Sequence, residues 1–227
     1  MARQLRLELR RQPSFRREDF IISPSNAAAV QALDAWPNWH AGRLALVGPA
    51  GSGKSHLARC WARRAHAVVL VAGADRPPDL SDLQDGRPVL IENADQGVPD
   101  DLLFHLINRA DTEGCSLLLT ARTPPATWPA ELPDLRSRLN ALHVALLPEP
   151  DDEILEAVLR KLFRDRNIKP SEELISYLLK RIERSVPYAR SIVDRLDELA
   201  DAEQKPVSRA LARQILESDA ETLNLFE

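Results

Sequence analysis

The amino-acid sequence predicts an α/β fold with a five-stranded parallel sheet, followed by a small all-helical domain. Five short apolar segments alternate with helical patterns up to residue 146. Each segment is apolar at consecutive positions, which is typical of strands that are covered on both faces of a parallel sheet. After residue 150 only helical periodicity remains, and the Pro-containing turn "LPEPDD" (147–152) predicts the boundary between the two parts.

Length and composition limit the class of protein. With 227 residues, the chain is long enough for one large domain, or for a domain with a smaller companion. Its 44% hydrophobic and 28% charged residues are typical of a folded, soluble protein, and the net charge of -4 predicts no strong overall attraction to nucleic acid. Cys60 and Cys115 have no metal-binding spacing, and no signal peptide or membrane span is predicted, so we expect a cytoplasmic protein.

The first four elements follow from residues 20–72. Ser25 is a plausible cap for a helix over 25–36. The apolar run "RLALVG" (43–48) ends in glycine and predicts a buried strand, and "AVVLVA" (67–72) predicts a second one. Between them, "KSHLARCWARRA" (54–65) predicts a helix, because four apolar residues recur at helical spacing: Leu57, Ala58, Trp61 and Ala65.

The remaining elements continue this alternation. Strands are predicted within "RPVLIENAD" (87–95), "CSLLLTAR" (115–122) and "ALHVAL" (141–146), with helices over 100–112 and 134–139 between them. The helical part is predicted to contain helices at 151–166, 171–183, 187–203 and 207–218. The expected organisation is a leader at 1–19, an α/β domain at 20–148, a helical domain at 149–218 and an acidic tail at 219–227.

The segment "GPAGSGKS" (48–55) has the pattern G-x-x-x-x-G-K-[ST] between a predicted strand and a predicted helix. Glycines let the backbone N–H groups turn inward around phosphate oxygens, and the start of the helix adds a partial positive charge. Lys54 is expected to reach the β- and γ-phosphates of a nucleotide, and Ser55 to ligate Mg²⁺. The predicted phosphate-binding residues are Gly48, Pro49, Ala50, Gly51, Ser52, Gly53, Lys54 and Ser55.

A carboxylate that could hold Mg²⁺ follows another predicted strand. In "VLIEN" (89–93), three apolar residues precede Glu92, which we expect to be the second Mg²⁺ ligand; the alternative is a solvated acid at a strand end. Asn93 stands where an ATPase often has a second carboxylate that activates water. Because an amide cannot act as a base, binding of a nucleotide is expected to survive this change better than hydrolysis.

These motifs, together with "LLLTAR" and the trailing helical domain, resemble those of AAA+ proteins. "LPDLRSRL" (132–139) resembles the arginine-finger segment of the bacterial replication initiator DnaA and its paralogous Hda family. "PYARSIVDRLDELA" (187–200) resembles their sensor II helix, and "FIISPSNAAAVQAL" (20–33) their adenine-side segment. The resemblance covers nearly the whole chain. The absence of a helicase-binding domain and of a helix-turn-helix is the layout of the Hda family, so no sequence-specific DNA binding is expected.

The leader contains a peptide that resembles the clamp-binding motif of this family. In "QLRLEL" (4–9), Gln4 precedes three leucines at alternate positions, Leu5, Leu7 and Leu9. Apolar side chains on one face of an extended peptide can enter a groove of a DNA-polymerase sliding clamp. The alternatives are a first strand or a leader without a partner. "TLNLF" (222–226) is a weaker match, with Thr222 in place of the usual glutamine, and an acidic tail is its other interpretation.

The resemblance also implies roles for two arginines. Arg138 matches the arginine finger, which acts in trans on a nucleotide held by a neighbouring protein, here ATP-bound DnaA. Arg136 is a competing candidate, and a surface arginine paired with Asp134 is the simpler interpretation. Arg190 matches sensor II, which brings the helical lid domain onto the phosphates of the bound nucleotide. The alternative is one more charge on an arginine-rich helical face.

Two polar residues complete the candidate site. Thr120, at the end of the fourth predicted strand, matches the sensor I region and could contact a water molecule or the γ-phosphate. A buried threonine with its own hydrogen bond is the alternative. Asn26 could border the adenine pocket or cap a helix.

The resemblance implies a negative regulator of replication initiation that binds ADP or ATP with Mg²⁺. It would dock on the DNA-loaded sliding clamp at the replisome and stimulate ATP hydrolysis by DnaA, which leaves inactive ADP-bound DnaA. Its own ATPase is expected to be weak, so it would act as an activator more than as an enzyme. One alternative is a self-oligomerising AAA+ ATPase, such as a helicase- or clamp-loading factor. Another is a DNA-binding module, against which the acidic charge balance argues.

Overall fold

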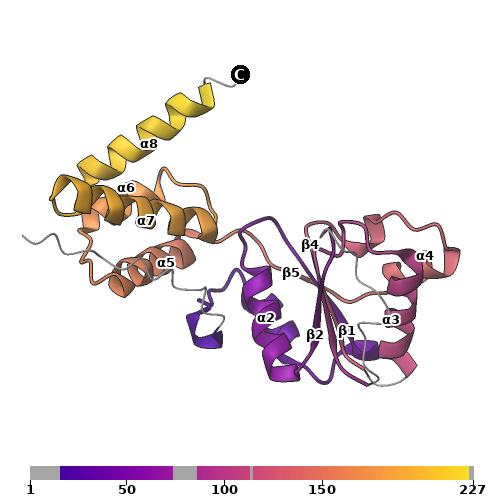
Figure 1. Cartoon of the computed structure of the whole chain (residues 1–227). Coiled ribbons are helices and arrows are strands. Elements are labelled where there is room, and N and C mark those ends of the chain that lie inside the picture. Colours follow the sequence, from indigo (N-terminus) through magenta and orange to yellow (C-terminus); the bar gives the residue numbers. More distant parts are fainter. Residues whose placement is uncertain (1–15, 74–85, 113–114, 225–227) are drawn as a thin grey trace, which may run out of the picture.

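A computed structural model describes residues 16–73, 86–112 and 115–224 of the chain. These residues form a sheet-containing part and a helical part that lie side by side (Figure 1). All five strands belong to one sheet in the order β2-β3-β4-β1-β5. The strands are β1 (Arg43–Val47), β2 (Val68–Val71), β3 (Val89–Glu92), β4 (Leu117–Ala121) and β5 (Val144–Leu146).

Every pairing in the sheet is parallel, which confirms the predicted fold class. Strand β1 lies between β4 and β5, and its register with β4 places Arg43 opposite Leu117 and Val47 opposite Ala121. Because the strands are parallel, the segments that follow β1, β3 and β4 leave the sheet at the same edge. This edge is where open α/β sheets place their ligands.

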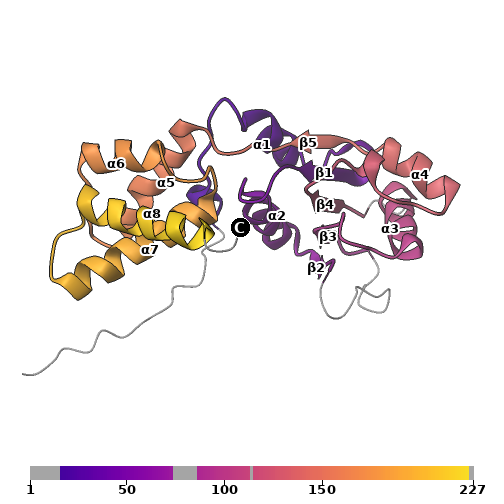
Figure 2. The same cartoon turned by 90° about the horizontal axis from the view of Figure 1, so that it is seen from above.

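Helices cover both faces of the sheet, as Figure 2 shows from above. Helices α1 (Ala27–Asp34) and α2 (Lys54–Ala65) pack on one face, and α3 (Asp100–Thr112) and α4 (Pro133–Asn140) on the other. Successive strand residues alternate between the two cores. Leu44 and Leu46 pack with α1 and α2, whereas Ala45 and Val47 pack with α3 and α4. The strands β1, β3 and β4 are apolar at consecutive positions because both of their faces are buried, whereas the edge strands β2 and β5 leave Val69, Val71 and Leu146 exposed.

The helical part has a core of its own. It is built from α5 (Asp152–Asp165), α6 (Glu172–Leu179), α7 (Val186–Glu203) and α8 (Arg209–Asn224). Phe163, Leu155 and Leu196 are fully buried at its centre. The largest differences from the expected helices are at two ends: α6 stops at Leu179 instead of 183, and α8 continues to Asn224 instead of 218. The extension of α8 has a tertiary cause: both carboxylate oxygens of Asp219 accept hydrogen bonds from Arg195 of α7, at 2.7 and 2.8 Å.

Polar contacts join the helical part to the sheet-containing part. Ser23 donates a hydrogen bond of 2.7 Å to Asp151, which lies just before α5. Lys161 of α5 forms an ion pair with Asp19. The backbone N–H of Val186, the first residue of α7, donates to the carbonyl of Gly51 at 3.3 Å. The helical part is therefore anchored beside the loop that joins β1 to α2.

Asp151 connects local and tertiary structure, and its replacement by alanine is expected to lower the free energy of unfolding by about 1 kcal/mol. One of its oxygens accepts from the backbone N–H of Ile154 at 2.8 Å and caps α5, while the other accepts from Ser23. Urea unfolding at pH 7 measures the loss. The neighbouring Glu153→Ala, a change of equal charge at an exposed position, is expected to cost less than about 0.5 kcal/mol. Equal stability of Asp151→Ala and the wild type would contradict this role.

The same contact predicts a pH dependence of stability. The backbone N–H of Ile154 holds the pKa of the Asp151 carboxyl below its usual value of 3.8. A lowered folded-state pKa means that the contribution is complete above the unfolded-state pKa and is lost as the pH falls through the folded-state pKa. The stability difference between the wild type and Asp151→Ala is therefore expected to be constant near neutral pH and to shrink below about pH 4.

Candidate phosphate-binding site

The loop 48–55 leaves β1 at the carboxyl edge of the sheet and enters α2. Gly51 and Gly53 have positive φ angles of 76° and 99°, a conformation that favours glycine. Both also lack room for a side chain. A Cβ on Gly51 would lie 2.4 Å from the Ser185 hydroxyl oxygen, and one on Gly53 would lie 2.8 Å from the ring of Phe20. The glycines thus permit both the turn of the loop and its close packing.

Backbone donors in this loop are available to a ligand. Within the described ranges, the N–H groups of Gly51, Gly53, Lys54 and Ser55 make no hydrogen bond. The first N–H groups of a helix have no partner inside it, and a helix start carries a partial positive charge. An anion with several oxygens is the ligand that such a set of donors accommodates best. The loop therefore fits a phosphate group.

Lys54 lies inside this loop. Its side-chain Nζ donates to the carbonyl oxygens of Gly48 and Pro49, both at 2.7 Å, and the residue is 9% exposed. Burial lowers the pKa of Lys54, the charge of Arg122 lowers it further, and the charge of Asp95 raises it. These effects place one more cation and one carboxylate near the ammonium. A phosphate could replace the two carbonyls as its acceptor.

Glu92 occupies an environment that differs from the expected one. Its side chain is only 3% exposed, which rules out a solvated acid at a strand end. Its Oε2 accepts two hydrogen bonds from Arg59 of α2, from Nε at 3.0 Å and from Nη2 at 2.6 Å. The other oxygen, Oε1, is buried and has no hydrogen-bond partner among the described residues. A guanidinium thus stands where the sequence predicted Mg²⁺.

This arrangement does not fit the expected role of Glu92 as a Mg²⁺ ligand. Mg²⁺ requires near-octahedral coordination and usually keeps several water molecules. Around Glu92 the side chains leave the carboxylate closed to solvent, and a cation is already bound to it. Ser55, the other expected ligand, is exposed at the start of α2. The sequence analysis did not consider a cation from α2, and it therefore missed this ion pair.

Thr120 has the environment of a buried structural residue. It is 1% exposed, and its hydroxyl oxygen accepts the backbone N–H of Asn93 at 3.1 Å. This bond joins the ends of β3 and β4 and holds Asn93 in a left-handed conformation, with φ of 57°. The buried alternative for Thr120 is therefore what the structure describes, and a contact with a nucleotide remains a proposal.

The sequence analysis missed two residues whose charges act on Lys54. They are Asp95 and Arg122. Asp95 lies just beyond β3, and its Oδ2 accepts from the backbone N–H groups of Arg122 at 2.8 Å and Thr123 at 3.1 Å. The charges of both Asp95 and Arg122 act on Lys54. A signal was present for Asp95, since an acid shortly after a strand that runs parallel to β1 reaches the same edge of the sheet.

The start of α7 lies directly against the loop. Ser185 caps this helix by accepting from the N–H of Tyr188 at 3.4 Å, and it is the residue that a side chain on Gly51 would strike. Arg190, the expected sensor II residue, lies further along α7 and is exposed. It forms no hydrogen bond or ion pair with the residues that the structure describes. No sequence signal singled out Ser185, because its role depends on the packing of the two parts.

Asn26 does not cap a helix with its side chain. It is 3% exposed, its Oδ1 accepts from the N–H of Ser23 at 3.0 Å, and its Nδ2 donates to the carbonyl of Ile21 at 3.0 Å. These bonds shape the segment that precedes α1. The expected cap Ser25 also lies outside the helix, which begins at Ala27, because the chain makes a turn over residues 23–26 first.

Arg138 lies on α4, where α3 holds its side chain. Its Nε donates to Oδ1 of Asn108 at 2.6 Å, and its guanidinium carbon lies 4.8 Å from the centre of the Phe104 ring. The ion pair with Asp134 that the sequence left open is not formed, and the terminal nitrogens have no partner among the described residues. Arg136 instead donates to the Ala130 carbonyl at 2.9 Å. One edge of the Arg138 guanidinium is therefore available to another molecule.

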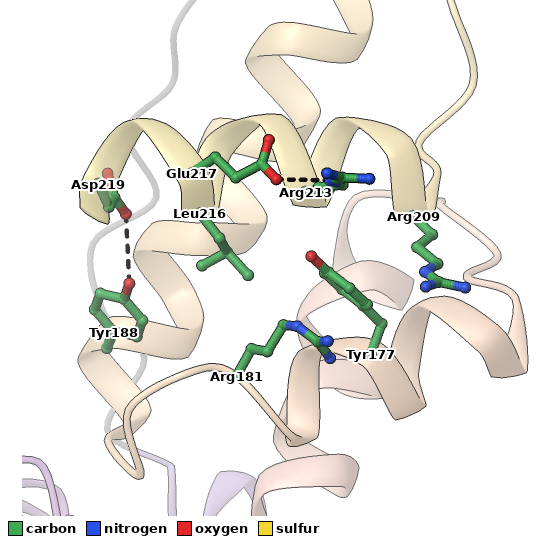
Figure 3. A pocket seen from close by; sticks show the side chains of 8 residues that line it. All are labelled: Tyr177, Arg181, Tyr188, Arg209, Arg213, Leu216, Glu217 and Asp219. Atoms are coloured by element: carbon green, nitrogen blue, oxygen red, sulfur yellow. Dashed lines mark hydrogen bonds and ion pairs between the residues drawn. The ribbon is translucent and has the colours of Figure 1, made fainter. Parts of the chain in front are cut away.

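A separate hollow of about 540 Å³ lies between helices of the helical part (Figure 3). Guanidinium groups of Arg181 and Arg209 lie 4.2 and 5.1 Å from the centre of the Tyr177 ring. Arg213 pairs with Glu217 at 2.6 Å, and Arg209 pairs with Glu173 at the same distance. Because carboxylates already balance two of its three arginines, this hollow is explained by the packing of α6, α7 and α8.

Two expectations concern residues that the structure does not describe. The predicted clamp-binding residues Gln4, Leu5, Leu7 and Leu9 lie outside the described ranges, and so does the end of "TLNLF". Of the helices that are described, none combines the length and the apolar character needed to cross a bilayer.

No family model matches the chain. Domain III of the replication initiation protein DnaA from Thermotoga maritima is similar, with a TM-score of 0.72 and 19% identity over 91% of this chain and 97% of that chain. A single-residue variant of Thermotoga maritima RuvB has a TM-score of 0.70 and 16% identity over 90% and 72% of the two chains. AMPPCP-bound DnaA from Aquifex aeolicus has a TM-score of 0.64 and 20% identity over 83% and 66%. At these identities, the similarities show that the chain shares the fold of DnaA domain III and RuvB.

Proposed function

We propose that this chain, which has the DnaA-like AAA+ fold, is a regulator of the Hda type that stimulates ATP hydrolysis on DnaA. The observation that carries the proposal is Arg138. The side chain is oriented by Asn108 and Phe104, and its terminal nitrogens are not engaged by any described residue. An arginine held in this way suits a nucleotide bound to a neighbouring protein, where it stabilises the charge on the transferring phosphoryl group.

The chain itself binds ADP or ATP at the loop 48–55. The donors of this loop and Lys54 support phosphate binding. The AMPPCP bound to the Aquifex aeolicus DnaA supports an adenine nucleotide as the ligand class. Arg190 and Asn26 are proposed to contact the phosphate and adenine ends of this nucleotide, and Thr120 to lie close to its γ-phosphate.

The chain is a poor ATPase in this proposal. Asn93 replaces the usual carboxylate, and an amide cannot remove a proton from water. Asp95, whose charge acts on Lys54, is another acid at this edge of the sheet, but its Oδ2 already accepts hydrogen bonds from Arg122 and Thr123. The chemistry therefore occurs on the nucleotide of the partner. The product is ADP-bound DnaA, which is inactive for a second round of initiation.

Docking on the DNA-loaded sliding clamp completes the proposal and rests on the sequence of residues 4–9 alone. The variant with both Gln4→Ala and Leu5→Ala is expected to bind the purified sliding clamp at least about tenfold more weakly than the wild type. Burial of one leucine contributes roughly 1.5–3 kcal/mol, and 1.4 kcal/mol corresponds to about a tenfold change in affinity. Surface plasmon resonance on immobilised clamp measures the difference.

A matched control changes the other face of the same peptide. In an extended segment Arg6 and Glu8 point away from the leucines, so Arg6→Ala with Glu8→Ala is expected to retain binding. If the Gln4 and Leu5 variant binds the clamp as tightly as the wild type, residues 4–9 are not the docking peptide. Deletion of 222–226 would then test the second match.

A further inference from the structure

We propose that the loop 48–55 binds its nucleotide without Mg²⁺, because Arg59 takes the place of the metal ion at Glu92. The inference rests on the proposed nucleotide binding and specifies its cation requirement. Glu92 was expected to ligate Mg²⁺, but the structure contains an ion pair between Glu92 and Arg59 at this position.

The geometry of the pair leaves little room for a competing cation. Arg59 of α2 reaches the end of β3 and donates two hydrogen bonds to the same oxygen of Glu92. The Glu92 side chain is 3% exposed, whereas the Arg59 side chain is 42% exposed. The arginine thus approaches from the surface and closes the carboxylate from that side. A metal ion could reach the carboxylate only by displacing the guanidinium.

The Arg59 guanidinium and a Mg²⁺ ion would compete for Glu92 because both are positively charged. Glu92 carries one negative charge, and Arg59 is the cation within ion-pair distance of it in the described part of the chain. A metal ion added to the intact pair would repel the guanidinium and would need space for its own water molecules. The second oxygen of Glu92, which has no partner among the described residues, is buried and therefore inaccessible to hydrated Mg²⁺.

Other groups at the loop can balance the charge of a phosphate. Lys54 lies within the loop, and the unengaged N–H groups at the start of α2 add further donors. The charges of two further residues act on Lys54, because Arg122 lowers the pKa of its ammonium and Asp95 raises it. In this proposal the protein itself supplies, at this edge of the sheet, the positive charge that Mg²⁺ supplies in other nucleotide-binding sites.

The test is the affinity of the full-length chain for ADP, measured by calorimetric titration in excess Mg²⁺ and again in excess EDTA. The two dissociation constants of the wild type are expected to agree within about twofold. Arg59→Ala frees the Glu92 carboxylate, so this variant is expected to bind ADP at least about tenfold more tightly in Mg²⁺ than in EDTA. Arg64→Ala removes an arginine of the same helix that stacks over Trp36 at 5.1 Å, and it should behave as the wild type does.

Glu92→Gln provides a second variant that preserves the pair's shape. Its amide oxygen can still accept from Arg59, so ADP affinity in Mg²⁺ is expected to stay within about twofold of the wild type. If Glu92 were a metal ligand, this change would weaken binding in Mg²⁺ and leave binding in EDTA unchanged. This comparison does not depend on the folding of Arg59→Ala.

The outcomes separate this inference from the proposed function. Wild-type binding that weakens at least about tenfold in EDTA would overturn the inference while leaving nucleotide binding intact. An Arg59→Ala variant that binds equally in both media would show that Arg59 is not the reason for metal independence, and would overturn it too. Absence of ADP binding in both media would overturn the proposed nucleotide binding, and this inference with it.

Discussion

Arg138→Ala is expected to reduce the stimulated rate of ATP hydrolysis on DnaA by about a thousandfold. An arginine finger contributes roughly 10³–10⁵ in rate, because its charge is placed against the transferring phosphoryl group. The measurement is the rate of phosphate release from ATP-bound DnaA, with clamp loaded on DNA and the chain in excess. A loss of this size would exceed any effect expected from a surface charge, which changes rates and affinities only modestly.

Arg136→Ala is the matched control for this experiment. Arg136 lies on the same helix and carries the same charge, but its guanidinium donates to the Ala130 carbonyl instead of resting on α3. This variant is expected to retain the stimulation within a few-fold. Equal losses in the two variants would indicate a general charge effect of α4 and would contradict a specific role for Arg138.

The Arg138→Ala variant also distinguishes the proposal from the alternative of a self-oligomerising ATPase. That alternative requires vigorous ATP hydrolysis by the chain alone, with a specific activity that rises with its concentration and disappears in Arg138→Ala. The proposal expects weak hydrolysis at all concentrations, since Asn93 stands in place of a carboxylate. Strong concentration-dependent turnover would therefore favour the alternative.

Lys54→Ala is expected to weaken nucleotide binding by at least about a hundredfold. Its ammonium lies inside the loop, where it would exchange the Gly48 and Pro49 carbonyls for phosphate oxygens. Charge-assisted hydrogen bonds contribute roughly 1.5–3 kcal/mol each, so the loss of two of them removes about 3 kcal/mol or more, which corresponds to about a hundredfold in affinity. Titration of ADP into each protein measures the change.

Folding must be checked in this variant, because Lys54 also bonds two loop carbonyls. The melting temperature without nucleotide shows whether the loop tolerates the change, and Lys180→Ala, at the C-terminal end of α6, serves as the control. A folded Lys54→Ala that binds ADP as the wild type does would place the nucleotide elsewhere.

Much of the fold followed from local patterns. The apolar runs of β1, β3 and β4 predicted strands buried on both faces, and the glycine-rich segment at 48–55 predicted the turn between β1 and α2. These predictions succeeded because the backbone period and the tolerance for positive φ depend on neighbouring residues in the chain. Parallel pairing then brings the ends of β1, β3 and β4 to one edge, so the place of the site could be inferred as well.

Contacts between residues far apart in the chain were decided by the tertiary structure. Arg59 and Glu92 are 33 residues apart, and no local sequence pattern predicts that they form an ion pair. Ser185 meets Gly51 only because the two parts of the molecule pack together, and α8 continues past its expected end because Arg195 holds Asp219. The local sequence is compatible both with a solvated side chain and with one that is paired to a distant residue. Sequence periodicity therefore determined the elements and the loop, whereas three-dimensional packing selected the partner of each charged side chain.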